Sequence, residues 1–596
     1  MTYHFDLPEH VEKGLSELEA AEEIADFFSK ISQEYDPLCI KTLPQRVQTK
    51  LEVDPCDHPY YEEHEIFTEL LGTKVTCSVP DDIPTEILKE FLPELCTPIT
   101  AIINQSFSSH KWPESFKKEY GIPLNKIPIP ESEDDLRSIG LTPYLSKRME
   151  KLLIKWIWKY ISPHIGSDQL GGLPGCSVVH YIIRMIDFIL SNLDNSSKNP
   201  GAVIAATVDF SKAFNRMSHN KIVTILSDLN IPTCALRIII SYLSNRSLCI
   251  RYHGAVSSDR DMPGGGPQGT LLIVLLFILQ VNLAGDACLP PATLPEGVSG
   301  PEPDPDSVAP PKPCQTVGKT ENKKFVDDLT MIEHISLKNN LEPIEPFIGP
   351  SNFHDRHGLR LPAENTILQH KLKDLLDFTE ENHMKINMKK TKIIPFNFTK
   401  TRDFTPELSF PDGEAIEVIY QTKLVGLVID SSLSWGPHVE YTTKNACKKL
   451  WQLIRFKNLG ASQSQLITLY QLKIRCLLEF AAPAFHGALT KQQSEDLEMV
   501  QKKALAIILG SEYRSYSRAL KTTSLENLSV RRLILCTNFA KKCSIHPRHA
   551  ADLFLKNPRY THKSSKRKFL EPKCCTTRYQ KSAIPFLTKV LNNSDK

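Results

Sequence analysis

The stretch Phe325-Val326-Asp327-Asp328-Leu329 places two adjacent carboxylates between apolar residues. The apolar pattern continues through Met331 and Ile332, which predicts a strand, a tight turn and a second strand, with the two aspartates at the tip. Neighbouring carboxylates raise each other's pKa and destabilise a fold unless a cation neutralises them. An isolated Asp-Asp pair is most often an acidic turn in solvent, so its chemistry depends on what lies beside it.

A second apolar run upstream also ends in an aspartate. Residues 203–208, Val-Ile-Ala-Ala-Thr-Val, have strand-forming composition and lead directly into Asp209. If neighbouring strands bring Asp209 beside Asp327, the carboxylates can hold two Mg²⁺ ions about 4 Å apart, with Mn²⁺ as a substitute. That geometry activates an attacking 3′-oxygen and stabilises a leaving phosphate, so the candidate chemistry is nucleotidyl transfer.

The composition is that of an ordinary globular protein. The chain has 596 residues, of which 41% are hydrophobic and 23% charged, enough for several domains. Its longest apolar run, Leu271–Leu279, is too short to span a bilayer, and the amino terminus has no signal-peptide pattern. The 15 cysteines are scattered without regular spacing, as is typical of thiols. We expect no membrane partner and an intracellular location, in cytoplasm or nucleus.

The net charge of +2 conceals a division along the chain. Residues 371–596 hold 38 Lys and Arg against 20 Asp and Glu, a balance of +18, whereas the rest of the chain carries −16. We expect the basic part to bind a phosphate backbone. For any single basic cluster a solvated face is the simpler interpretation.

Hydrophobic periodicity and proline content divide the chain into four regions. Residues 1–110 have helical spacing and form an N-terminal extension; 111–440 mix strands, helices and Gly-rich turns; 441–545 are nearly all helix; and 546–596 form a basic tail. Residues 289–313 contain nine prolines and are interpreted as an insert in the second region. Thr422–Asp430 is predicted to be one strand.

Four further side chains have types suited to a nucleotide. Lys126 and Arg137 flank a predicted hairpin and could grip a triphosphate, although alone they are surface charges. Phe214, five residues past Asp209, could pack under a sugar and exclude a 2′-hydroxyl, and core packing is an equal alternative. Gln268, in a Gly-rich turn, could contact a template base or the nucleotide.

Cysteines and histidines near the carboxyl end raise the question of zinc. Cys543 and His546 lie close together, with Cys536 and the Cys574-Cys575 pair nearby in the sequence. The spacing fits no common zinc motif, and Cys536 occupies an apolar helix position. The sequence alone therefore assigns no zinc site.

The order of these pieces resembles one family, the reverse transcriptases of non-LTR retrotransposons of the jockey and chicken-repeat type. The resemblance covers roughly residues 110–440 and rests on motifs in a fixed order. They are Leu-Asn-Lys-Ile-Pro, Asp-Leu-Arg-Ser-Ile-Gly-Leu-Thr, Gln-Leu-Gly-Gly, Val-Asp-Phe-Ser-Lys-Ala-Phe, Gly-Gly-Pro-Gln-Gly-Thr-Leu-Leu, Phe-Val-Asp-Asp-Leu, Ile-Asn-Met-Lys-Lys-Thr-Lys and Leu-Val-Gly-Leu-Val-Ile-Asp-Ser-Ser-Leu-Ser-Trp.

This resemblance implies an α+β fold, a right-hand polymerase with fingers, palm and thumb and helical extensions at both ends. It also implies a role for each candidate residue: Mg²⁺ on Asp209, Asp327 and Asp328; triphosphate contacts from Lys126 and Arg137; a sugar gate at Phe214, with Phe210 among the nucleotide-binding residues; Gln268 at the templating pair; and Lys390 as proton donor to pyrophosphate. The implied partners are an RNA template, a DNA primer and dNTPs.

The chain also departs from the family pattern. Asn215 stands where members usually have Asp, and Ile273-Val274 where they usually have Gly-Pro. About 110 residues precede the motifs, too few for the endonuclease domain of such elements, so a separate endonuclease is the expected partner. One alternative is a catalytically decayed, reverse-transcriptase-derived nucleic-acid-binding remnant. Another is an RNA-dependent RNA polymerase, which Phe214 disfavours.

Overall fold

The computed structural model of the chain forms two compact units. Unit 1 comprises Met1–Gly172, Phe210–Ala287 and Leu375–Asn387, and unit 2 comprises Leu173–Asp209, Cys288–Asp374 and Met388–Lys596. The structure describes residues 7–594 apart from 54–57, 73–78, 80–82, 195–200, 283–318, 327, 337–341, 344–358, 362–365, 399–403, 547–552, 559 and 561–566. Each unit is built from segments distant in the sequence.

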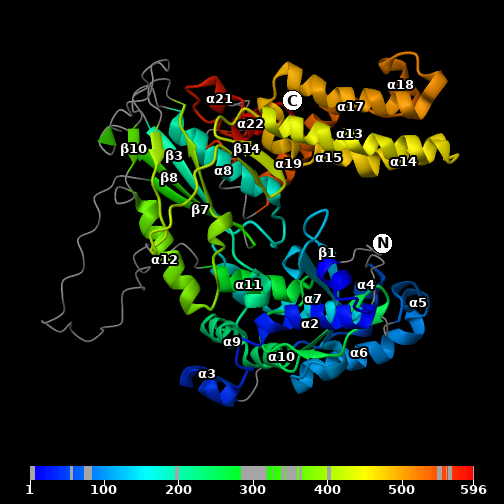
Figure 1. Cartoon of the computed structure of the whole chain (residues 1–596), viewed down its shortest axis with the longest axis vertical. Helices are drawn as coiled ribbons and strands as arrows, with labels where there is room; N and C mark the ends of the chain where they lie inside the picture. The colour runs from blue at the N-terminus through cyan, green and yellow to red at the C-terminus, as the bar shows by residue number, and fades with distance from the viewer. Residues whose placement is uncertain are drawn as a thin grey trace, which may run out of the picture. The chain divides into compact units, whose positions relative to one another are not determined.

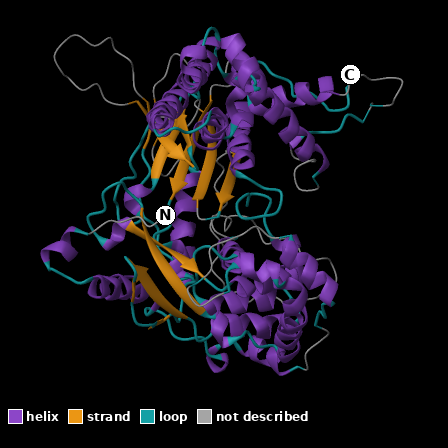
Figure 2. Cartoon of the chain, turned by 90° about the vertical axis from the view of Figure 1, so that its right-hand side faces the viewer, coloured by secondary structure: helices purple, strands orange, loops and turns teal. Residues whose placement is uncertain are grey.

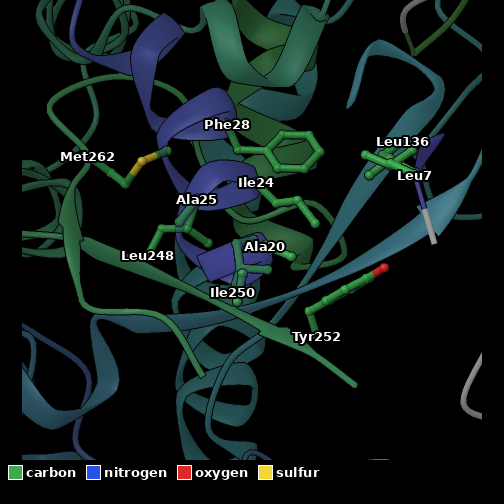
Figure 3. Close-up of a cluster of buried hydrophobic side chains, with 11 residues drawn as sticks. Leu7, Ala20, Ile24, Ala25, Phe28, Leu136, Leu248, Ile250, Tyr252 and Met262 are labelled. Carbon is green, nitrogen blue, oxygen red and sulfur yellow. The ribbon is translucent and has the colours of Figure 1, made fainter. Parts of the chain in front are cut away.

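The sheet of unit 1 is formed by strands in the order β2-β1-β4-β5, with β6 also paired to β4. These strands are β1 Lys118–Asn125, β2 Leu136–Leu141, β4 Ser247–Tyr252, β5 Ala255–Val256 and β6 Arg260–Asp261. Helix α2, Glu17–Ser32, packs on β4 through the buried Ala20, Ile24 and Phe28 (Figure 3). Because these side chains recur every three to four residues, one face of α2 is apolar and covers the sheet.

Helices make up most of the rest of unit 1. They are α1 Pro8–Glu12, α3 Gln45–Glu52, α4 Glu63–Leu71, α5 Thr85–Glu90, α6 Leu92–Ser109, α7 Tyr144–Ile161, α9 His219–Asp228, α10 Thr233–Leu243 and α11 Leu271–Val281. Helix α2 begins with a capping box, in which Ser16 and Glu19 each bond the other's backbone N–H. Helix α11 is almost wholly buried, as its unbroken apolar sequence requires.

The main sheet of unit 2 has the order β11-β3-β8-β7, and all its neighbouring strands are antiparallel (Figure 1). The strands are β3 Gly201–Val208, β7 Lys319–Phe325, β8 Asp328–Ser336 and β11 Lys392–Phe396. Helix α8, Val178–Leu193, packs against β3 and β7. Strand β3 lies in the middle of the sheet, which explains why nearly all its side chains are buried.

Two smaller sheets and a helical region complete unit 2. The small sheets contain β9 Glu342–Pro343, β10 Leu359–Leu361 and β12 Phe404–Pro406, and β13 Gln421–Leu424 with β14 Leu427–Asp430. The helices, coloured purple in Figure 2, are α13 Gly436–Asn458, α14 Gln463–Tyr470, α15 Cys476–Glu479, α16 Ala482–Phe485, α17 Lys491–Leu509, α18 Tyr516–Thr523, α19 Leu528–Ile545, α21 Thr577–Gln580 and α22 Ala583–Ser594. Helix α12, Ile367–Glu381, has residues in both units.

The predicted α+β class is confirmed, since helices occur together with sheets in which most strand pairs are antiparallel. One predicted element is wrong: Thr422–Asp430 is not a single strand but the hairpin β13–β14. Val425 and Gly426 both adopt positive φ, at 41° and 95°, which turns the chain back on itself. The Pro-rich insert 289–313 lies outside the described residues, and the three boundaries between the four predicted regions stay predictions. In the described part of the chain, no helix is long and apolar enough to cross a membrane.

Candidate active site

Two of the predicted carboxylates come together at one end of the unit 2 sheet. Asp209 directly follows β3, and Asp328 is the first residue of β8. The register pairs Val208 with Leu329, so Asp209 and Asp328 occupy the next opposing positions of the antiparallel pair. Phe325 pairs with Asp328 across the β7–β8 turn, as the sequence predicts. Asp327 lies outside the described residues.

Lys390 lies at the same end of the sheet. It closes a short 3₁₀ segment, Met388–Lys390, just before β11, whose Lys392 pairs with Thr207 of β3. The Lys390 Nζ is 3.6 Å from the Asp209 Oδ2, and both side chains are accessible, at 68% and 38% exposure. An ammonium group beside the Asp209 carboxylate is suitably placed to donate a proton.

A residue that the sequence did not single out contacts both strands that flank the β7–β8 turn. Tyr181 of α8 is fully buried, and its hydroxyl lies 2.6 Å from the Thr330 Oγ1. Its ring also packs edge-on against Phe325, with centroids 6.0 Å apart. Burial raises the pKa of Tyr181, and the nearby Asp328 carboxylate raises it further. The phenol therefore stays neutral and fixes the position at which β8 begins.

The donor set at this end of the sheet fits a hard divalent cation. Asp209 and Asp328 present carboxylate oxygens, the ligand type that Mg²⁺ and Mn²⁺ prefer, and both side chains are only partly buried. Without a cation, carboxylates on opposing strand positions repel each other. The residues present therefore fit a metal, and Asp327 supplies a third carboxylate in the sequence.

In unit 1, Phe214 lies on the 3₁₀ segment Ala213–Arg216. In space this segment contacts both the Gly-rich turn and helix α11. Its ring is 4.8 Å from that of Phe277, and it is partly exposed. Phe210 is buried and pairs through its backbone with Ile386. The Phe214 ring therefore packs against the core on one side and is accessible on another. This geometry suits the predicted contact with the sugar of a nucleotide.

The Gly-rich turn packs tightly on the segment that carries Phe214. Gly265 has φ +72°, and a Cβ there would lie 2.9 Å from the Asn215 carbonyl oxygen. The Gln268 Nε2 donates to the Asn215 Oδ1 at 3.4 Å, and the Gln268 carbonyl accepts from the Gly140 N–H at 3.0 Å. Asn215, the departure from the family pattern, therefore holds Gln268.

The predicted hairpin of Lys126 and Arg137 is formed by β1 and β2. Arg137 pairs with Leu124, is exposed, and lies three residues before Gly140 in β2. Lys126 follows β1, and its Nζ donates to the Asp134 carbonyl oxygen at 2.6 Å. The hairpin that carries the two cations is therefore joined to the Gly-rich turn through the Gly140 to Gln268 hydrogen bond.

Two buried carboxyl groups behind this turn were not singled out from the sequence. The Glu150 Oε2 accepts from the Leu272 N–H at 3.1 Å and so caps the start of α11 from α7. Glu119 of β1 packs against Gly140, whose Cβ would clash with its carboxylate. Burial raises the pKa of each to about 7, and the Arg246 guanidinium opposes the rise. In the sequence Glu119 follows Lys118 and Glu150 precedes Lys151, so neither gave a signal of its burial.

The structure therefore gathers the predicted residues into two groups, one in each unit. Unit 2 brings together Asp209, Asp328 and Lys390. Unit 1 brings together Phe214 and Gln268 and joins their turn to the hairpin of Lys126 and Arg137. The roles of these residues stay predictions.

Residues 129–286 match the family model described as reverse transcriptase (RNA-dependent DNA polymerase). This part of the chain is a reverse-transcriptase domain, which confirms the class predicted from the motifs. Such domains depend on divalent metal ions in general, and the family's RNA dependence supports an RNA template as a partner.

The chain is similar to RNA-directed DNA polymerases of non-LTR retrotransposons. It is 23% identical over 358 residues to the probable RNA-directed DNA polymerase from transposon BS of Drosophila melanogaster, covering 60% of this chain and 34% of that protein. To the probable polymerase from transposon X-element of the same species it is 24% identical, covering 42% and 28%. To the polymerase from mobile element jockey, also of this species, it is 25% identical, covering 30% and 19%. The chain thus spans about a third or less of these relatives.

Among solved structures, the chain is similar to telomerases of two Candida species. Apo telomerase from Candida tropicalis, truncated from its C-terminal domain, matches with 11% identity and a TM-score of 0.32, covering 60% of this chain and 62% of that one. Telomerase from Candida albicans in complex with a TWJ fragment of telomeric RNA matches with 10% identity and a TM-score of 0.31, covering 78% and 68%. The right-hand polymerase class is supported by the reverse-transcriptase match and by the antiparallel sheet that carries the aspartates.

Proposed function

We propose that the chain is an RNA-directed DNA polymerase that adds dNTPs to the 3′-hydroxyl of a DNA primer on an RNA template. The observation that carries the proposal is the pairing of Asp209 with Asp328 at one end of the unit 2 sheet, with the Lys390 ammonium 3.6 Å from Asp209. Carboxylates in this arrangement suit the two-metal chemistry of nucleotidyl transfer. The reverse-transcriptase match over 129–286 supports the same reaction.

In this proposal Asp209, Asp328 and Asp327 hold two Mg²⁺ ions, and Mn²⁺ serves as a substitute. Divalent ions held by these carboxylates would supply charge neutralisation for the primer hydroxyl and for the leaving pyrophosphate. Lys390 holds a proton at its Nζ and delivers it to pyrophosphate, because its exposed ammonium lies beside Asp209.

Unit 1 contributes contacts to the nucleotide in the same proposal. Arg137 and Lys126 bind the triphosphate, Arg137 through a bidentate fork and Lys126 as a point charge. The partly exposed edge of Phe214 excludes a 2′-hydroxyl and so selects dNTPs. Gln268, held by Asn215, contacts the templating pair.

Helix α13 of unit 2 offers a surface for the nucleic acid. Trp451 is 58% exposed, and the Arg455 guanidinium lies 5.2 Å from the centre of its ring. Lys444, Lys448 and Lys449 add positive charge to the same helix. Aromatic rings stack on bases and basic side chains attract phosphates, so α13 is suited to hold the primer-template.

The test is primer extension by the full chain on an RNA template with dNTPs and Mg²⁺. We expect extension by the unaltered chain and none by Asp209→Asn, because the amide loses the charge that holds a cation. Asp412→Asn is the matched control: Asp412 is an exposed aspartate of unit 2, and its side chain accepts a hydrogen bond from the nearby Glu414 N–H. Extension by Asp209→Asn at the unaltered rate would contradict the proposal.

A nucleic-acid-binding remnant is the second candidate, favoured by Asn215 in place of the usual Asp. Its signature is tight binding of primer-template with no extension by any variant, in Mg²⁺ or Mn²⁺. An RNA-dependent RNA polymerase is distinguished in the same assay, because it would incorporate rNTPs as readily as dNTPs. Under our proposal Phe214→Val raises rNTP incorporation at least tenfold, while dNTP incorporation continues.

A further inference from the structure

A cavity in unit 2 collects cysteine and histidine side chains from two distant parts of the sequence. It has a volume of about 600 Å³, and its lining includes Cys176, His180, Cys543 and His546. Cys176 and His180 flank the start of α8, whereas Cys543 and His546 lie at the end of α19. Two thiols and two imidazoles around one cavity form the donor set of a zinc site.

One pair of these donors is already in contact. The His180 Nε2 lies 3.2 Å from the Cys543 Sγ, and both side chains are at least 95% buried. A tetrahedral Zn²⁺ with bonds of about 2.3 Å to sulfur and about 2.0 Å to nitrogen holds its ligand atoms at about this separation. The pair therefore defines one edge of a tetrahedral site.

The second ring nitrogen of His180, Nδ1, has a hydrogen-bond partner, as is usual for metal-binding histidines. Its Nδ1 lies 2.9 Å from the Ser177 Oγ. Ser177 is the N-cap residue of α8, yet its hydroxyl makes no cap hydrogen bond and faces the imidazole instead. Donation from Nδ1–H to this oxygen leaves the Nε2 lone pair directed at Cys543, and metal-binding histidines are usually oriented in this way.

The other two donors are close to this pair. The His546 ring packs against Gly175, because a Cβ on Gly175 would lie 2.2 Å from the His546 Nε2. Gly175 also has φ +75°, and it precedes Cys176 directly. The Cys176 thiol lines the same cavity as the Cys543 thiol. Position 175 therefore requires glycine, because a side chain there would collide with the His546 ring.

In this structure the ligand atoms of Cys176, His180, Cys543 and His546 are not gathered closely enough to bind one metal ion together. Among the described residues, the three ligand atoms that lie within 4.8 Å of one another belong to His10, Glu23 and Glu133. That group in unit 1 carries its own counterion, because the Lys13 Nζ lies 3.2 Å from Glu23. In the unit 2 cavity, Cys176 and His546 are partly exposed, and a tetrahedral site requires both side chains to rotate into the cavity.

We infer that Cys176, His180, Cys543 and His546 bind one Zn²⁺ ion, which joins the start of α8 to the end of α19. Binding displaces one proton from each thiol, so one Zn²⁺ enters and two protons leave, and the site is neutral overall. The role is structural, since four protein ligands leave no open position for a substrate. The inference is independent of the proposed polymerase activity and of its Mg²⁺ ions.

The test is the zinc content of the full chain, purified with zinc in the medium and dialysed, measured by mass spectrometry of the metal. We expect about one zinc per chain in the unaltered protein and near zero in Cys543→Ser and in His180→Ala. Cys536→Ser is the matched control: Cys536 is also a buried cysteine of α19, seven residues earlier, but it does not line the cavity. Asp209→Asn must also retain zinc if the site is separate from the carboxylates.

A Co²⁺-loaded sample provides the second readout, which reports the identity of the ligands. Tetrahedral Co²⁺ with thiolate ligands absorbs strongly, and the sulfur-to-cobalt band should fall by about half in Cys176→Ser, which keeps one thiolate. Absence of zinc from the unaltered chain after purification with added zinc overturns the inference. So does full zinc retention by Cys543→Ser and His180→Ala, since the metal then lies elsewhere.

Discussion

Replacing Glu150 by Gln should stabilise unit 1 at alkaline pH and reduce its sensitivity to pH. The Glu150 carboxyl is fully buried in α7, and burial raises its pKa from 4.5 to about 7. Hydrogen bonds from the Leu272 N–H and the Tyr242 hydroxyl, and the charge of Arg246, only partly offset this rise. A raised carboxyl pKa means that the folded state binds the proton more tightly than the unfolded state.

The sign and size of the effect follow from this shift. Between pH 4.5 and pH 7 the unfolded chain has released the proton that the folded chain still holds, so stability falls as pH rises. One pKa unit corresponds to about 1.4 kcal/mol, so Glu150 should lower the stability of unit 1 by about 2 to 3 kcal/mol between pH 5 and pH 8. A glutamine side chain in its place would not titrate, and the amide oxygen could still accept from the Leu272 N–H.

The assay is hydrogen exchange followed by mass spectrometry, read on peptides covering α11, Leu271–Val281. The free energy of opening of α11 should decrease between pH 5 and pH 8 in the unaltered chain. In Glu150→Gln this decrease should be smaller by about 2 to 3 kcal/mol. Glu119→Gln should act in the same direction, because burial raises that pKa to about 7 as well. Exposed Glu12→Gln is the control. An equal pH dependence in Glu150→Gln and the unaltered chain would refute the reasoning.

Three further predictions concern the supports and chemistry of the site. Gly265→Ala should destabilise unit 1 by about 1 to 3 kcal/mol more than Gly254→Ala in denaturant unfolding, since both glycines have positive φ but a Cβ at Gly254 meets nothing within 4 Å. Tyr181→Phe should cost unit 2 about 1 to 2 kcal/mol by removing the hydrogen bond to Thr330, and Thr330→Val should add little to it in a double-mutant cycle. Lys390→Gln should slow single-turnover dNTP addition by about 10² or more.

The sequence predicted the elements that carry the aspartates because each of them has a strong local signal. The apolar run before Asp209 and the Asp-Asp turn predicted β3, β7 and β8, and the antiparallel pairing of β7 with β8 follows from the tight turn that joins them. The approach of Lys390 to Asp209 was implied by a motif and now has a distance.

Two of the features that the sequence did not predict depend on contacts between distant segments. Glu150 caps a helix more than a hundred residues away, and nothing in its own helix indicates this. His180 and Cys543 lie 363 positions apart, so a search for zinc motifs along the chain could not pair them. The β13–β14 hairpin was mistaken for one strand because a Val at positive φ is rare and leaves no signal in composition.

The central claim is that the clustered aspartates carry out nucleotidyl transfer. The most direct measurement is the single-turnover rate of adding one dNTP to a primer on an RNA template, with primer-template affinity measured alongside, for the unaltered chain and Asp327→Ala. The account predicts a rate at least about 10³-fold lower in Asp327→Ala with the affinity unchanged within a few fold. An equal rate in the two proteins would contradict it.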